Sequence, residues 1–141
     1  MAVDQDQGSI AIEAAILVPA ILLFLLLVIA AGRVETTKGV VDAAARDAAR
    51  SASLTRTPGA ATQAAEESAA ATLDQEGVAC RGQQSINVDF TPQTQGQAGS
   101  VAVTVTCVVP LSDLVVPGLP GSTTETSTFT SVLDIYRAQT R

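Results

Sequence analysis

Residues 8–32 of the chain read GSIAIEAAILVPAILLFLLLVIAAG, and this stretch decides the fold. The eighteen residues from Ala14 to Ala31 are uncharged and apolar, Pro19 included. At about 1.5 Å per residue, a helix of this length spans most of a hydrocarbon layer roughly 30 Å thick. We therefore predict a helix that crosses a membrane, with the larger part of the 141-residue chain on its C-terminal side.

Two residues in this stretch are unfavourable in a helix that only anchors. Glu13 places a carboxylate at the apolar edge, and Pro19 removes a helical hydrogen bond and clashes with the preceding turn. Each residue has a simpler alternative explanation when it is considered alone. Glu13 is then a residue at the membrane interface that reaches the headgroups, and Pro19 is a tolerated kink. Their common spacing from Gly8 favours a joint role in helix assembly.

The composition argues against several classes of function. The 8 Lys and Arg form no basic run and face 14 Asp and Glu, a net charge of −6, so we expect no nucleic acid partner. Histidine, the commonest metal ligand and the usual general base, does not occur. The sequence also offers no nucleophile elbow, phosphate loop or metal-ligand spacing, so we expect no enzyme, cofactor, metal or small-molecule substrate.

An Ala-rich amphipathic segment continues the apolar run, and residues 10–56 read as one long helix whose second half projects from the membrane. Two helices hinged near Gly32 are the alternative. Charged residues stand at the spacing of helix-surface pairs: Asp42 with Arg46, and Asp47 with Arg50.

A second helix is predicted between Pro58 and Gly77, with Thr57 as its N-cap and the glycine just past its end. Its apolar face is almost entirely alanine, so it must pack tightly on the first helix. Its acidic residues read as a solvated face rather than a cation site: Glu66, Glu67, Asp74 and Glu76.

After Cys80 the apolar period changes to two, which predicts a small antiparallel three-stranded sheet. The strands cover residues 86–90, 101–107 and 123–137, and a long hairpin loop, PQTQGQAGS, joins the first two. The third strand places Phe129, Leu133 and Ile135 on one face. The proline-rich linker 110–122 is either a lid over the core or a patch for a partner, and we favour the lid. Its apolar residues are Leu111, Leu114, Val115, Val116 and Leu119.

Cys80 and Cys107 both follow the apolar segment. Beyond a membrane crossing they predict an extracytoplasmic disulfide, which stabilises by roughly 3–4 kcal/mol in the chain-entropy model. Two buried thiols in a reducing compartment are the alternative.

The N-terminal motif Gly8-Ser9-x-x-x-Glu13, followed by five apolar residues and Pro19, resembles the processing site of type IV prepilins. More specifically, it is similar to TadE-like pseudopilins, the minor pilins of the tight-adherence (Flp) pilus system. The Ala-rich helix, the Cys pair, CVVPLSDL and the closing DIYR are similar to actinobacterial members.

The resemblance implies a pilin-like α+β fold, cleavage between Gly8 and Ser9 by a prepilin peptidase, and assembly through Glu13. The implied partners are that peptidase, other pilin or pseudopilin subunits, the inner-membrane assembly platform and the membrane. The new amine at Ser9 of one subunit would neutralise Glu13 of a neighbour, which makes this carboxylate a registry device. Pro19 would let the helix bend while packing.

We divide the chain into a leader (1–8), a transmembrane assembly helix (9–32), an extracytoplasmic Ala-rich helical region (33–79) and a small β domain (80–141). The leader lacks the basic residues usual in prepilins, and Arg33 and Lys38 lie beyond the far end of the apolar run. The positive-inside rule alone would make the C-terminal part cytoplasmic. We favour an extracytoplasmic head, in a pilus once assembled, because of the cysteines and the Thr/Val-rich sheet. The alternative function is a single-pass anchored binding module unrelated to pili.

Overall fold

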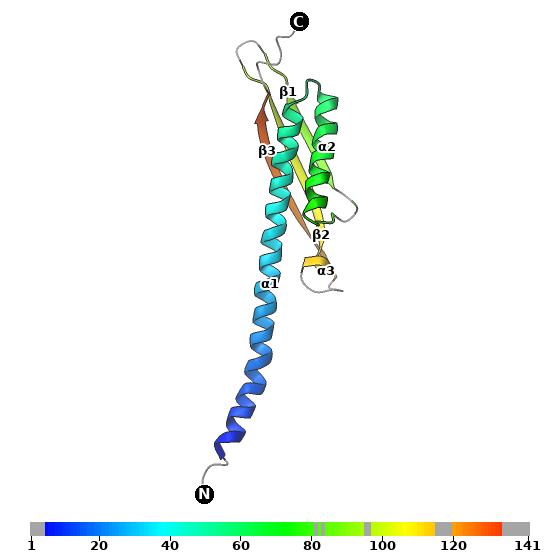
Figure 1. Cartoon of the computed structure of the whole chain (residues 1–141). Coiled ribbons are helices and arrows are strands. Elements are labelled where there is room, and N and C mark those ends of the chain that lie inside the picture. The colour runs from blue at the N-terminus through cyan, green and yellow to red at the C-terminus, as the bar shows by residue number, and fades with distance from the viewer. Residues whose placement is uncertain (1–4, 81, 83, 95–96, 115–119, 134–141) are drawn as a thin grey trace.

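The computed structural model describes residues 5–80, 82, 84–94, 97–114 and 120–133, and of residues 5–11 and 114 it describes the backbone alone. The elements in chain order are α1 (Gln5–Ser53), α2 (Pro58–Gln75), β1 (Ser85–Thr91), β2 (Ser100–Pro110), α3 (Leu111–Leu114) and β3 (Ser122–Val132). In Figure 1 the first half of α1 stands alone, and its second half forms a head with α2 and the sheet. The predicted α+β class, with a long apolar helix, a second helix and three antiparallel strands, is confirmed.

The first helix is continuous over 49 residues, so the hinge near Gly32 is not present. Two threonine hydroxyls bond back to the helix where the exposed half meets the head. Thr36 donates to the Gly32 carbonyl and Thr37 to the Arg33 carbonyl, each at 3.0 Å. These bonds satisfy the hydroxyls within a continuous helix and add no helix stability of their own.

Of the two predicted charge pairs on α1, Asp42 and Arg46 form an ion pair. Asp47 instead accepts a hydrogen bond at 3.2 Å from the Thr72 hydroxyl of α2. The carboxylate therefore joins the two helices rather than pairing along one of them.

Local signals fix both ends of α2. The Thr57 hydroxyl accepts the amide of Ala60 at 3.3 Å, as an N-cap does, and Pro58 occupies the first turn. Gly77 has a φ of +69°, the left-handed conformation that glycine adopts past a helix end. The buried face of α2 has a repeat of four: Ala61, Ala65, Ala69 and Leu73.

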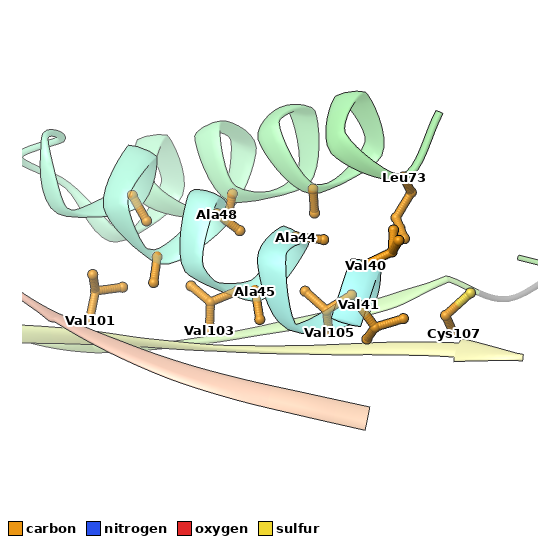
Figure 2. Packing of buried hydrophobic residues seen from close by; sticks show 14 of the residues in the cluster. Val40, Val41, Ala44, Ala45, Ala48, Leu73, Val101, Val103, Val105 and Cys107 are labelled. Atoms are coloured by element: carbon orange, nitrogen blue, oxygen red, sulfur yellow. The ribbon is translucent and has the colours of Figure 1, made fainter. Parts of the chain in front are cut away.

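The sheet has the order β1-β2-β3, and both pairs of neighbouring strands are antiparallel. The central row joins Val88, Val103 and Phe129. Both helices lie on one face of the sheet, where α1 packs on β2 and β3 and α2 lies beside α1 and contacts β1 (Figure 2). The buried residues of β2 point toward α1: Val101, Val103, Val105, Cys107 and Val109.

The core is made of small side chains. Alanines of α1 and α2 allow the two helices to approach closely, and the valines of β2 fill the space below α1 (Figure 2). Among the described residues, the largest side chains that are less than 2% exposed are valines and Cys107. Such a core has little room for a larger side chain.

Replacing Ala65 by leucine is expected to lower the free energy of unfolding by about 1–3 kcal/mol, because the new side chain has no space between the helices. Ala70→Leu, on the exposed face of the same helix, is the matched control and should change it by less than about 0.5 kcal/mol. Urea denaturation of the full chain in detergent micelles measures both. Equal effects of the two substitutions would contradict close packing at Ala65.

The third strand is Ser122–Val132, and residues 134–137 of the predicted strand lie outside the described residues. The amide of Leu133 donates to the Gly99 carbonyl at 2.8 Å, which continues the register of Val132 opposite Ser100 by one residue. Ile135 and Tyr136 lie outside the described residues. Phe129 does lie on the face that looks toward α1, but it is 39% exposed because its neighbours on that face of β3 are polar.

The linker after β2 begins with the short helix α3, which the sequence pattern did not predict. Leu111 is partly buried against the core, in the manner of a lid. The Leu114 side chain and the residues Val115, Val116 and Leu119 lie outside the described part of the chain.

Cys80 and Cys107 form the predicted disulfide, with their Cα atoms 5.2 Å apart. The bond ties the segment after α2 to the buried face of β2.

Candidate assembly helix

The first half of α1 exposes a large apolar surface. Its large apolar residues from Ile12 to Ile29 are 50–69% exposed, and the first buried side chain along the helix is that of Thr37. The 25 residues from Ile12 to Thr36 extend roughly 37 Å beyond the head. A surface of this size is unfavourable in water, so it requires lipid or other apolar helices. The helix is long and apolar enough to cross a membrane, which fits single-pass anchoring.

Two charged residues bracket this apolar surface. Glu13 is exposed at one end and Arg33 at the other, 20 residues apart. On a helix this separation is about 30 Å, close to the thickness of a hydrocarbon core. Glu13 therefore stands at the boundary of the span rather than at its centre. A carboxylate there costs less than the roughly 2.5–3.5 kcal/mol of the centre, but it still favours a cationic partner.

The residues of the predicted processing site belong to α1 itself. The backbone of Gly8 and Ser9 is helical, since α1 begins at Gln5. Ser9 and Glu13 are four residues apart and so stand one turn from each other along the helix. Pro19 lies within α1, where its ring leaves the Ala15 carbonyl without the usual helical donor. The structure thus places Gly8, Ser9, Glu13 and Pro19 on one continuous helix.

The glycines near the head leave space beside the helix. A Cβ atom at Gly32 or at Gly39 would meet nothing within 4 Å. The close backbone approach that these residues permit is thus not used within the chain, and is open to another subunit. Between them, Lys38 donates to Glu35 at 2.9 Å, and this hydrogen bond raises the pKa of Lys38.

Residues 8–50 match the family model described as TadE-like protein. The chain is TadE-like over this segment. The matched residues include Gly8, Ser9, Glu13 and Pro19, together with most of α1, and the match supports a pilin role related to the tight-adherence pilus. The rest of the chain, from α2 to β3, lies outside the match. Comparison with curated proteins and with solved structures gives no significant match.

Sequence reasoning missed the contact between α1 and β3. The Ser127 hydroxyl donates to Asp42 at 2.8 Å, and the Arg46 guanidinium lies 5.9 Å from the centre of the Phe129 ring. The alternation of residues along β3 could have indicated this contact. The residues on its α1-facing side are Thr123, Glu125, Ser127, Phe129 and Ser131. Four of these five are polar, which indicates a polar contact rather than a core-facing strand.

The acidic residues of α2 are exposed, as expected for a solvated face: Glu66, Glu67, Asp74 and Glu76. Within the described ranges no group of three or more Cys, Asp or Glu side chains is arranged to hold a metal ion. The described features of the site are therefore an apolar helix surface suited to packing and one carboxylate, Glu13, at the edge of that surface.

Proposed function

We propose that the protein is a minor pilin or pseudopilin of a tight-adherence pilus or secretion apparatus, with a structural and non-enzymatic role that needs no cofactor. The single observation that supports this most is the exposed apolar half of α1, with Glu13 at its edge inside the TadE-like match. In this proposal residues 9–32 anchor the subunit in the membrane and later pack against the same helices of other subunits.

The chemistry begins with removal of residues 1–8 by a prepilin peptidase. Hydrolysis after Gly8 shortens α1 and creates a cationic amine at Ser9. The amine of an incoming or preceding subunit neutralises Glu13 where both lie at the lipid boundary. Because a subunit out of register leaves this carboxylate unpaired, Glu13 selects the correct axial position of each helix.

Pro19 assists packing in this proposal. Without the amide proton at this position, the helix bends at lower cost than an uninterrupted one. Bending allows the helix to follow neighbours that are not straight.

The head is proposed to be extracytoplasmic. The disulfide between Cys80 and Cys107 favours an oxidising compartment. Arg33 and Lys38 at the head side of the span favour the opposite orientation by charge alone. We give the disulfide more weight, because Lys38 is paired with Glu35 and adds no net charge with it.

Gly8→Val is expected to block processing, because the resemblance to prepilins places a small residue before the cut. Intact-mass measurement of the membrane-extracted protein should show loss of residues 1–8 in the wild type and retention of the full chain in the variant. Gly32→Val is the matched control and should be processed normally, since its new side chain meets nothing within 4 Å in the chain.

An intact Met1 terminus on the wild-type protein, in cells with an active prepilin peptidase, would argue strongly against the proposed function. Processing of Gly8→Val at the same bond would argue against the assigned cut site alone.

A further inference from the structure

The outer edge of β3 is long, and no described segment of the chain pairs with it. All 11 residues of β3 pair with β2, from Ser122 opposite Pro110 to Val132 opposite Ser100, without a bulge. No strand in the described ranges pairs with the other edge of β3, since the sheet order is β1-β2-β3. Proteins commonly protect such edges with lysine, proline or a bulge. β3 contains none of these.

The other edge strand of the sheet differs in length and in the residue that follows it. Each edge strand carries one acidic residue, Asp89 in β1 and Glu125 in β3, but β1 has 7 residues and is followed at once by Pro92. Those features discourage addition of another strand. The contrast within one small sheet indicates that the edge of β3 is kept open for a partner strand.

A cavity of about 230 Å³ lies between α1 and β3. Its lining residues are Lys38, Val41 and Asp42 of α1 and Glu125, Thr126 and Ser127 of β3. Asp42 is ion-paired with Arg46 and Lys38 with Glu35, so Glu125 is the lining carboxylate to which the described residues supply no ion pair. The excess negative charge favours a cationic side chain as the occupant.

Phe129 stands two residues from Ser127 on the same face of β3. It is the exposed aromatic residue at this edge, and Arg46 covers it from α1. A strand added beside β3 would place alternate side chains on this face, with about 6.7 Å between successive ones. One such side chain would reach the cavity, and the next would pack on Phe129.

The opposite face of β3 carries a row of threonines, and two of them are hydrogen-bonded to threonines of β2. Thr128 bonds to Thr104 at 2.8 Å and Thr126 to Thr106 at 3.2 Å. Short uncharged polar residues of a new strand would continue these rows.

We propose that the free edge of β3 binds an extended segment of a partner protein as a fourth strand. The segment carries a basic residue that enters the cavity and an apolar residue two positions away that covers Phe129. This interaction goes beyond the assembly function of α1 and does not depend on processing or on Glu13.

Two arrangements of a second copy of this chain at this edge are unfavourable. β3 and the head half of α1 run in the same overall direction (Figure 1), so antiparallel pairing of two β3 strands would point the two α1 helices in opposite directions. If β1 of a second copy joined β3, each strand of the second copy would lie three strand positions away from its counterpart in the first copy. At about 20–25° per strand, this tilts the second α1 by roughly 60–75°, which is incompatible with two helices in one membrane.

The test uses the full-length protein, labelled with ¹⁵N, in detergent micelles. The probe is a capped peptide as long as the 11-residue β3, in which threonine alternates with valine and lysine replaces the central valine. This probe presents an apolar residue two positions from lysine in either strand direction. A twin peptide has glutamate in place of lysine.

Slowed hydrogen exchange at every second amide of β3 is expected with the lysine peptide, and about tenfold weaker binding with its twin. Glu125→Lys should abolish or reverse the preference, and Glu125→Gln should reduce it. Glu66→Lys, the same charge change on the exposed face of α2, should leave it unchanged.

Three results would overturn the proposal. One is unchanged exchange of the β3 amides at about 1 mM of either peptide. Another is equal binding of the two peptides. The third is protection of β3 that rises with protein concentration alone, which would assign the edge to a second copy.

Discussion

Replacing Cys80 and Cys107 together by alanine is expected to lower the free energy of unfolding of the head by about 3–4 kcal/mol. The bond joins residues 27 positions apart in sequence. Its loss therefore increases the conformational entropy of the unfolded chain, because the loop is no longer closed. The core of alanine and valine offers little to offset this loss. Hydrogen exchange of the β2 amides across a urea series, on the full chain in micelles, measures the change.

Reduction of the wild-type disulfide is the matched control, because it removes the cross-link and leaves the Cys107 sulfur in its buried place. The reduced protein should agree with the alanine variant to within about 1–2 kcal/mol, the difference being the cavity left at Cys107. Stability unaffected by a reductant that opens the bond would show that the native fold alone holds the end of β2.

Glu13→Ala is expected to reduce incorporation of the subunit into pili by about tenfold or more, because the neutralising partner of the Ser9 amine is lost. Processing after Gly8 should continue. The measurement compares the amounts of mature protein in sheared pili and in the membrane fraction.

Two further variants separate charge from helix packing. Glu13→Gln keeps the size of the side chain and should fail nearly as severely as alanine. Glu35→Ala removes an exposed carboxylate from the same helix beyond the apolar span, and should assemble normally. Normal incorporation of Glu13→Ala would remove the registry role and leave α1 as an anchor only.

The helices illustrate how far local sequence reasoning reaches. Thr57, Pro58 and Gly77 act through contacts with residues a few positions away, so their capping roles could be predicted without a tertiary structure. The continuity of α1 was not determined by local signals, because Gly32 weakens a helix and the threonines that follow it, Thr36 and Thr37, do not strengthen one.

The sheet shows where such reasoning stops. Alternation correctly predicted the buried face of β2, where every second residue from Val101 is apolar. It placed Phe129 on the correct face of β3, but it did not predict that this face meets Asp42 and Arg46 of α1. A pattern of side chains does not report which distant charged residues a strand will meet.

The sequence by itself determined the elements that depend on hydrophobicity and on neighbouring residues: the apolar span, the carboxylate at its edge, the helix ends and the strands. Only the tertiary structure decided what lies against β3. The strand order leaves one edge of it open, and Ser127 meets Asp42 across 85 positions of sequence. Contacts between such distant segments depend on how the whole chain packs, and no local preference encodes them.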